Sequence, residues 1–433
     1  MDDSSDPTAM ETLTKAPAPP RPLLTEDWAV VVLGLLIVAL SLAGLQVPAP
    51  AFGWESPGDL PVKILTKTNL LAIAGLFGFT YAIALLGTRL TGKSIRGTLL
   101  GFPVVFGLTL LALLLAGNKT LKDLNLEAVI FSLGIGLAVG NLTRLPGWLR
   151  AALATELWVK IGLVLLGASV IFGDILKAGA LGLVQALLVV LSVWYFAYWL
   201  AKRLKVDDEL TMMLASAVSI CGVSAAIATS GAIQGDPKKL SYVISLVLIT
   251  AIPMMMLMPW AAQWLGLSPE VTGAWLGGTI DTTGAVVASG TLAGEAALKI
   301  STIVKFSQNV LLGVAAFAIS VYWTYTKNQS DEVQAAKPTA GVIWERFPKF
   351  ILGFLAVSLL FSFVLPAASV DAVKGSLKSL QGLWFALAFT SIGLETRFAD
   401  LLSADNRRPL WVFLIAQAFN IVVTLGIASV LFG

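Results

Sequence analysis

Hydrophobic residues fill this chain in long runs that polar segments interrupt only briefly. About 20 consecutive apolar residues are needed for a helix to cross the hydrocarbon core of a bilayer. Thirteen stretches of roughly this kind follow one another, at residues 28–47, 63–87, 97–117, 127–141, 157–173, 178–201, 209–232, 240–265, 270–290, 298–325, 347–366, 380–396 and 409–432. Alternating strand patterns, which are typical of transmembrane barrels, are not visible. The pattern predicts an all-α polytopic membrane protein with about thirteen transmembrane helices.

The first 27 residues differ from the rest of the chain. They are rich in acidic residues, proline and small residues, a composition that favours disorder, and they lack the basic and apolar regions of a secretory signal peptide. Loops on the same side as this tail hold fifteen Lys and Arg residues, against ten on the other side. Because cytoplasmic loops carry the excess of basic residues, we expect a cytoplasmic N-terminus, an outside C-terminus and a multi-pass location in the cell inner (plasma) membrane.

Composition excludes several classes of function. Hydrophobic residues make up 57% of the 433 residues and charged residues 13%, about half of the roughly 25% charged residues of soluble domains. Histidine is absent and Cys221 is the single cysteine, which excludes imidazole proton relays, a disulfide framework and the usual zinc ligand sets. The net charge is +3, and the sequence contains no polybasic cluster of the kind that binds nucleic acid. We therefore expect no enzyme, no nucleic-acid partner, and no cofactor other than a coupling Na⁺ or H⁺.

Charged residues interrupt the apolar segment between residues 275 and 309. It reads WLGGTIDTTGAVVASG and then ALKISTIVKFSQN, which places Asp281 and Lys305 at membrane depth. A charged side chain there costs roughly 3 kcal/mol or more unless it is paired or faces water. Ser301, Lys305, Gln308 and Asn309 share one helix face. We predict that Asp281 and Lys305, together with Glu395 in a second polar stretch, couple transport to an ion.

The residues leave alternatives open for these charges. Asp281 can pair with Lys305, bind Na⁺ through its oxygens or take up a proton. Lys305 lies about two turns inside its stretch, so its stem can also reach the interface, and Asp281 can be a structural ion-pair partner or mark a helix end. Glu156 and Lys160, four residues apart, indicate an interfacial ion pair.

Two segments sixty residues apart share small, hydroxyl and glycine residues. SICGVSAAIATSG begins at Ser219 and TIDTTGAVVASGT begins at Thr279, and both are predicted to run in the same direction. Glycine lets a helix unwind and present its backbone to a cavity, whereas simple helix packing through small residues is the alternative. The predicted substrate-binding residues are Ser219, Cys221, Gly222, Ser224, Thr282, Thr283, Lys305, Gln308 and Asn309.

A different internal similarity indicates an inverted repeat. LGASVIFGDIL from Leu166 resembles IGLETRFADLL from Ile392, and the two predicted helices run in opposite directions. Many secondary transporters are built from inverted repeats, with interrupted helices holding the solute near the membrane midplane. Two helix ends that share a common type of termination by chance are the alternative.

Three motifs in order carry a resemblance to a known family. SICGVSAAIAT, GGTIDTTGAVVASG and VKFSQN resemble the YeiH family, described as candidate sulfate exporters, over residues 127–433. That family's distant similarity to bile-acid/sodium symporters and sodium/proton antiporters implies a core at 91–433. The core would hold two inverted five-helix repeats, with interrupted helices crossing at the centre, and residues 28–90 would add N-terminal helices. This chain has Asp281 and Thr282 where members of that family commonly carry a His–acid pair, and Gln308 where they often carry a basic residue. The resemblance therefore implies no particular substrate.

The sequence therefore predicts a secondary active transporter for a small anionic solute, sulfate-like or a small organic anion. Coupling to Na⁺ or H⁺ would act through Asp281. An anion channel is the alternative, and a membrane enzyme using Ser or Thr with Lys305 is a third class. No P-loop is present, so ATP-driven pumping is not expected. Membrane lipid is an expected partner, and a homo-oligomer remains open.

Overall fold

The computed structural model describes residues 22–45, 47–123, 128–327, 341–396 and 407–433. These residues form helices, and the one β-type contact within them is a bridge between Trp54 and Asn118. The all-α prediction is therefore confirmed. By length and composition, seven helices can cross a membrane: Lys67–Leu90, Ile95–Ala116, Gly147–Ser169, Ile175–Arg203, Pro237–Trp264, Glu295–Trp323 and Arg408–Phe432.

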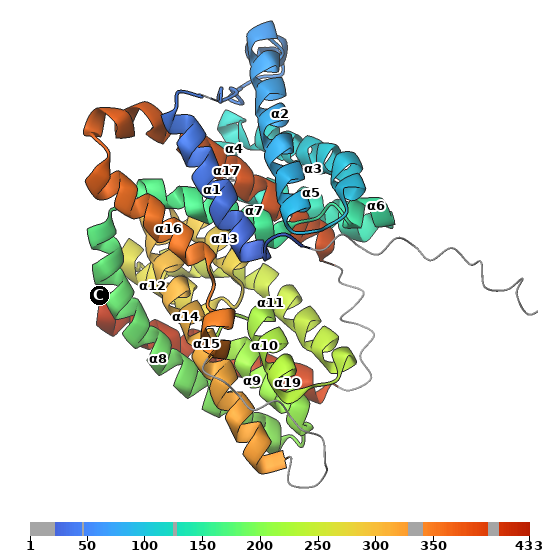
Figure 1. Cartoon of the computed structure of the whole chain (residues 1–433), viewed down its shortest axis with the longest axis vertical. Helices are drawn as coiled ribbons and strands as arrows, with labels where there is room; N and C mark the ends of the chain where they lie inside the picture. The colour runs from blue at the N-terminus through green and yellow to red at the C-terminus, as the bar shows by residue number, and fades with distance from the viewer. Residues whose placement is uncertain (1–21, 46, 124–127, 328–340, 397–406) are drawn as a thin grey trace, which may run out of the picture.

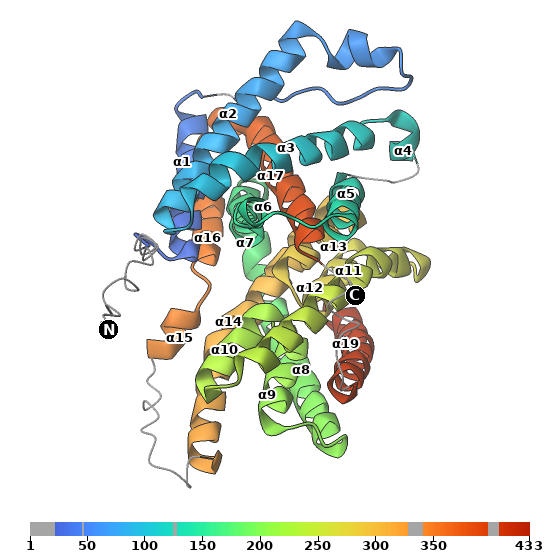
Figure 2. The same cartoon turned by 90° about the vertical axis from the view of Figure 1, so that its right-hand side faces the viewer.

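The helices form two bundles, the upper and lower halves of Figure 1. The first bundle contains α1 (Glu26–Leu42), α2 (Lys67–Leu90), α3 (Ile95–Ala116), α5 (Ala128–Leu142), α7 (Thr155–Leu166), α16 (Phe350–Leu359) and α17 (Ala367–Glu395), with the short helices η2 (Leu60–Ile64), α4 (Lys119–Asp123), α6 (Gly147–Arg150), η3 (Gly167–Ser169) and η4 (Leu360–Val364). The second contains α8 (Phe172–Arg203), α9 (Asp208–Ser219), α10 (Val223–Ile233), α11 (Pro237–Trp264), α12 (Pro269–Thr279), α13 (Thr283–Ala293), α14 (Glu295–Lys327) and α19 (Arg408–Phe432), and α15 (Gly341–Arg346) lies beside it. Figure 2 shows the same division from the side.

Glycines set the helix spacing in the first bundle. A Cβ built on Gly136 of α5 would lie 2.3 Å from Thr390 O of α17, and one built on Gly393 of α17 would lie 2.5 Å from Leu133 O. The two backbones therefore touch directly, which small residues permit in membrane helices. α17 continues through Gly393 to Glu395, so this glycine serves close packing.

The stretch predicted to span at 209–232 folds as a hairpin instead of crossing. α9 and α10, called hairpin 1, meet at residues 220–222 and return to the same end of the bundle. The N–H of Asp236, after α10, donates to Glu209 Oε2 in the first turn of α9 at 3.1 Å. Lys239 Nζ lies 2.8 Å from Asp207 Oδ1 and 3.2 Å from Glu209 Oε2. These contacts join the two ends of the hairpin.

The stretch predicted at 270–290 forms a matching hairpin from the opposite end. α12 and α13, called hairpin 2, meet at residues 280–282. Gly273, near the start of α12, packs on Ala297 and Ile300 of α14, while Gly290, near the end of α13, packs on Leu298 and Ser301. Both ends of hairpin 2 therefore lie at the start of α14, and the prediction of interrupted helices that cross at the centre is corrected to two hairpins meeting tip to tip.

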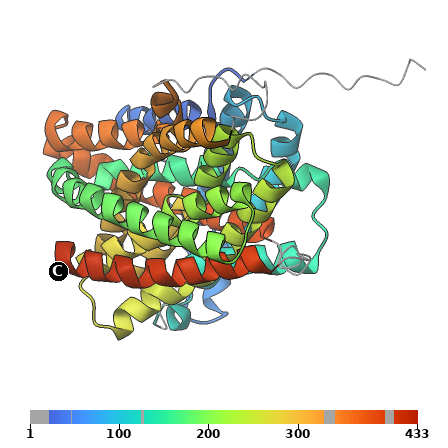
Figure 3. The same ribbon diagram turned by 90° about the horizontal axis from the view of Figure 1, so that it is seen from below.

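Long helices surround the hairpins. α8, α9 and α19 pack side by side, as the view from below shows (Figure 3), and α14 contacts α8, α10, α12 and α13. α11 begins at the base of hairpin 1 and contacts both hairpins before α12 follows it. Lys378 of α17 pairs with Glu295 at 2.7 Å, which ties the two bundles together at the hairpin 2 end.

Two further predictions concern repeats and domains. The segments sixty residues apart were predicted to run in the same direction, but as the tips of opposed hairpins they run in opposite directions. The other proposed repeat, Leu166 against Ile392, extends into residues 397–402, which lie outside the described residues. Two repeats of five helices and the boundaries at 27 and 90 remain predictions. The structure does show that α1 packs against α7 and α16.

Candidate functional site

The site lies where the hairpin tips meet. Tip 1 (residues 220–222) needs glycine because Gly222 has φ +62°, a left-handed conformation that glycine adopts at little cost. A Cβ at Gly222 would also lie 2.6 Å from Val247 Cγ1. In tip 2 (residues 280–282), Ile280 ends α12 in an extended conformation, and Thr282 caps α13 by accepting the N–H of Ala285 at 3.2 Å.

Three side chains each bridge the two hairpins. Lys305 Nζ donates to Ile220 O and to Ile280 O, both at 2.9 Å. Gln308 Nε2 donates to Ser219 O at 2.8 Å and to Gly278 O at 3.3 Å. Asn420 Nδ2 of α19 donates to Val218 O at 3.1 Å and to Thr279 O at 3.2 Å. The acceptors are carbonyls near the ends of α9 and α12, where helices leave carbonyl groups without intrahelical partners.

These bridges have a local two-fold pattern. Adding sixty to the numbers of Val218, Ser219 and Ile220 gives Gly278, Thr279 and Ile280. Lys305 therefore joins two equivalent residues. Gln308 and Asn420 make exchanged contacts, since one joins 219 to 278 and the other joins 218 to 279. The sequence similarity at this offset thus corresponds to hairpins that face each other around the Lys305 ammonium.

All three N–H donors of the Lys305 ammonium group bond to acceptors within the protein. Its side chain is 1% exposed, so the predicted alternative that it reaches the membrane interface does not hold. An ammonium group has three N–H donors, and the third bond goes to Gln308 Oε1 at 2.8 Å. Half-helix C-termini carry partial negative charge, so a cation at this position stabilises the meeting of α9 and α12.

Asp281, by contrast, has a buried carboxylate oxygen without a hydrogen-bond partner in the part of the chain that the structure describes. It is 2% exposed, and its Oδ2 has no hydrogen-bond partner among the described residues. The direct ion pair with Lys305 that the sequence allowed is replaced by the bonds of Lys305 to carbonyl groups. Asn309, on the same helix as Lys305, donates Nδ2 to Thr283 Oγ1 at 3.2 Å, while its own Oδ1 is a buried atom without a partner. A carboxylate and an amide oxygen beside tip 2 are therefore unpaired acceptors.

A cavity of about 180 Å³ lies between the hairpin tips and the first bundle. Its lining from the second bundle includes the first residue of α10, Val223, and Thr282, Gly284 and Ala285 at the start of α13. The N–H groups of a first helical turn have no acceptor within their own helix and carry partial positive charge. The cavity is therefore bounded by the N-terminal ends of two half-helices.

The opposite wall belongs to α7 and α17. It includes Thr155 and Glu156 of α7 and Glu395 and Thr396 at the end of α17. Glu395 is exposed. Glu156 forms the predicted pair with Lys160 at 3.5 Å, although Lys160 lies closer to Asp27, at 3.0 Å. Glu156 is thus a cavity residue as well as a partner of Lys160.

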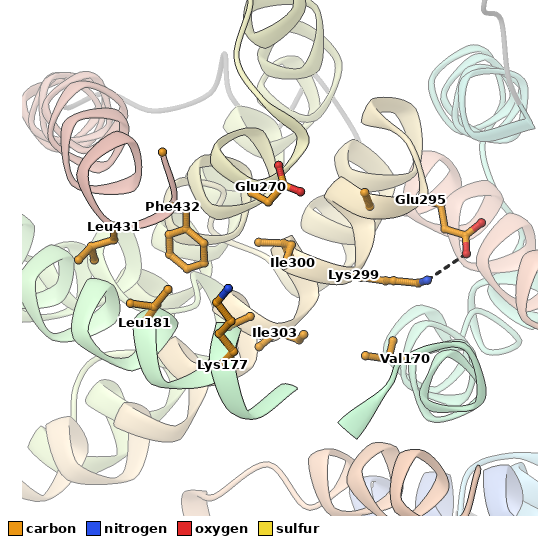
Figure 4. Close-up of a pocket in the computed structure, with 13 residues that line it drawn as sticks. Val170, Lys177, Leu181, Glu270, Glu295, Lys299, Ile300, Ile303, Leu431 and Phe432 are labelled. Atoms are coloured by element: carbon orange, nitrogen blue, oxygen red, sulfur yellow. Dashed lines mark ion pairs between the residues drawn. The ribbon is translucent and has the colours of Figure 1, made fainter. Parts of the chain in front are cut away.

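A larger cavity of about 690 Å³ lies at the base of hairpin 2 (Figure 4). Lys177 of α8, Glu270 of α12 and Phe432 of α19 surround it, and Lys299 is paired with Glu295 at 3.1 Å. It contains none of the tip residues. We place the candidate site at the smaller cavity because the starts of α10 and α13 line it and because Thr282, the residue after Asp281, is one of its lining residues.

The predicted site residues fall into different positions. The tips bring together Ser219, Cys221, Gly222, Asp281, Thr282, Thr283, Lys305, Gln308 and Asn309, whereas Ser224 is exposed on α10 and Glu395 lies across the cavity. Sequence reasoning missed Gln417 and Asn420, whose amides donate to Thr279 O. Their spacing of three residues within an apolar helix was the available signal.

Comparison with known proteins finds similar membrane proteins in several organisms. A family model described as "Conserved hypothetical protein 698" matches residues 100–412. A "UPF0324 membrane protein" of Rhodopirellula baltica is 40% identical over 83% of this chain and 68% of its own length, and one of Nitratidesulfovibrio vulgaris is 37% identical over 86% and 65%. A third, from Nitrosomonas europaea, is 26% identical over 87% of this chain and 89% of its own length. The chain thus spans about two thirds of the first two relatives. No solved structure matches.

Proposed function

Since the chain belongs to the UPF0324 (YeiH) family of membrane proteins, we propose that it is a secondary active transporter for a small anionic solute. The observation that carries the proposal is the meeting of two opposed hairpins at a cavity bounded by the starts of α10 and α13. Half-helix N-termini that face an anionic group near the midplane, with broken-helix carbonyls holding a cation, are features of secondary transporters. The arrangement offers hydrogen-bond donors and acceptors for binding a solute, so we propose transport rather than catalysis.

The solute would bind at the starts of α10 and α13. Their first-turn N–H groups and the hydroxyls of Thr282 and Thr155 supply hydrogen-bond donors, and a volume of about 180 Å³ limits the solute to a small anion. Sulfate-like ions and small organic anions fit this description. Glu395 on the opposite wall disfavours an anion unless a cation or proton enters with it, so solute binding and ion binding would be linked there.

Asp281 is the proposed coupling residue. Its unpaired Oδ2 is buried beside tip 2, and a buried carboxylate without a partner gains most from binding a cation or a proton. Thr282, the next residue, lines the cavity. Loading or neutralising Asp281 would therefore change the electrostatics of the start of α13, where the solute binds.

The hairpins also strengthen the proposed orientation. Lys239 lies at the base of hairpin 1 beside Asp207, so Lys238 and Lys239 move to the side that holds the α8–α9 loop. The count of basic residues becomes seventeen against eight in place of fifteen against ten. This supports a cytoplasmic hairpin 1 base and N-terminus, and an outside C-terminus, in the cell inner membrane.

Flux measurements test the proposal. Radiolabelled sulfate, sulfite and small carboxylates are offered to proteoliposomes under imposed pH or Na⁺ gradients, for wild type, Asp281→Asn and the control Glu270→Gln. We expect gradient-driven flux in wild type and in the control, and loss or uncoupling in Asp281→Asn. Equal flux in all three proteins would remove Asp281 from coupling. Ion currents far above carrier turnover would instead indicate the alternative, an anion channel.

A further inference from the structure

The position of Lys305 Nζ has the features of a monovalent cation site. Two carbonyl oxygens from different hairpins, Ile220 O and Ile280 O, and one amide oxygen, Gln308 Oε1, surround it at 2.8–2.9 Å. Carbonyls of unwound helices and half-helix C-termini are the groups that coordinate Na⁺ in transporters with broken helices. Here the ammonium group of the protein's own side chain takes that position.

We propose that Lys305 acts as a tethered cation that replaces Na⁺ between the hairpin tips and leaves a proton as the ion that Asp281 exchanges, so that solute flux needs no Na⁺. The consequence for flux rests on the proposed transport function, whereas the cation site itself does not. The number of donors on the ammonium group matches the number of acceptors around it. The side chain is 1% exposed, so the charge is held inside the protein.

The neighbouring carbonyls at the tips accept from amide side chains. Ser219 O and Gly278 O accept from Gln308, and Val218 O and Thr279 O accept from Asn420. Gln417 donates to Thr279 O as well, at 3.0 Å. Among the described residues, the buried oxygens without a partner near tip 2 are Asp281 Oδ2, Asn309 Oδ1, Thr279 Oγ1 and Gln417 Oε1. Asp281 is the carboxylate in this set, so the fixed cation is assigned to Lys305 and the exchangeable proton to Asp281.

Removing the ammonium should expose the site to small cations. Lys305→Ala is compared with wild type by thermal unfolding in detergent, in chloride salts of Na⁺, methylammonium or choline at equal ionic strength. We expect Lys305→Ala to unfold at a lower temperature than wild type and to recover part of the difference in Na⁺ or methylammonium. Choline should not restore it, because its trimethylated head is too large and lacks N–H donors.

The control is Lys299→Ala, six residues earlier on α14, where the lysine pairs with Glu295. We expect this variant to respond equally to the three salts. An equal response of Lys305→Ala to all three salts, or no loss of stability, would overturn the proposal. If Lys305→Ala does not fold, Lys305→Gln, which keeps donors without the charge, replaces it in the same comparison.

Wild-type flux gives an independent test. Replacing Na⁺ by choline on both sides of the vesicle, at a fixed pH gradient, should leave solute flux unchanged within about 20%. Flux that requires Na⁺ would contradict the proposal even if the variants could not be prepared. Recovery of Lys305→Ala by methylammonium, without flux of any tested solute in wild type, would retain the cation site and reject the transport function.

Discussion

Gly222 and Asp281 lie against each other across the two hairpin tips. A Cβ built on Gly222 would lie 3.1 Å from Asp281 Cβ. The glycine of one hairpin therefore makes room for the acidic residue of the other, and the two tips fit together only while position 222 has no side chain. This contact places the proposed coupling residue within the reach of both hairpins.

Replacing Gly222 by alanine should weaken this fit. The positive-φ conformation of Gly222 costs a residue with a side chain roughly 1–3 kcal/mol, and Val247 Cγ1 at 2.6 Å must move as well. We expect Gly222→Ala to lower the unfolding temperature in detergent and to reduce solute flux. Gly107→Ala in α3 is the control, because a Cβ there meets nothing within 4 Å. Equal stability of the two variants would show that tip 1 adapts freely.

We expect the amide bridges of Gln308 and Asn420 to contribute similar amounts to the free energy of unfolding. Gln308→Leu leaves Ser219 O and Gly278 O without their side-chain donor. Asn420→Leu leaves Val218 O without one, while Thr279 O keeps the bond from Gln417. An unsatisfied buried polar group costs about 1–3 kcal/mol, so we expect each variant to lose stability on that scale, measured by denaturant or thermal unfolding. The exposed Gln263→Leu in α11 serves as control. A loss confined to one of the two bridges would reject the two-fold description of the tips.

The hairpin topology predicts which loops share a side of the membrane. On a Cys221→Ser background, which has no other cysteine, single cysteines are placed at Lys205, Lys238 and Gln263. We expect a membrane-impermeant thiol reagent to label positions 205 and 238 from one side and position 263 from the other. Labelling of 205 and 263 from the same side, with 238 opposite, is the result that crossing helices would give.

Close packing of α5 on α17 predicts different effects for two neighbouring glycines. Gly136→Ala should destabilise the first bundle, because Thr390 O lies 2.3 Å from the added Cβ and is a backbone atom that cannot rotate away. Gly134→Ala, on the same helix, meets nothing within 4 Å and should be neutral or slightly stabilising. Thermal unfolding of the two variants, compared with wild type, provides the measurement. A neutral Gly136→Ala would mean that α5 and α17 can separate.

The sequence predicts the membrane class and much of the chemistry, but not the topology of the broken segments. Apolar length marks each helical region, and buried charge identifies Asp281 and Lys305. The stretch at 209–232 is long enough to cross a bilayer, so length alone indicates a span. This stretch turns back to the side where it began because of tertiary contacts, such as the ion pair of Lys239 with Asp207. The hydrophobic pattern gives no sign of such contacts between the two ends of the stretch. The excess of basic residues at Lys238 and Lys239 was the one sequence signal for it.

The partner of Lys305 could not be predicted for a related reason. Sequence reasoning pairs an acid with a base because side-chain charges are visible, whereas main-chain carbonyls become acceptors only when a helix ends. Ile220 and Ile280 are apolar in the sequence, yet their carbonyl groups hold the ammonium. Gln417 and Asn420 were overlooked because their acceptors are main-chain groups too.

The shared ammonium group also limits how the molecule can rearrange. If the hairpins were pulled apart, Ile220 O or Ile280 O would lose its donor inside the membrane, where an unpaired polar group costs several kcal/mol. A movement of the second bundle relative to α7 and α17 breaks none of these bonds at the tips, and Gly284 of α13 presents no side chain toward Ile392 of α17 and Val159 of α7. If the protein transports a solute as proposed, a movement of the two joined hairpins as one rigid body would keep these bonds, whereas a separation of the hairpins would break them.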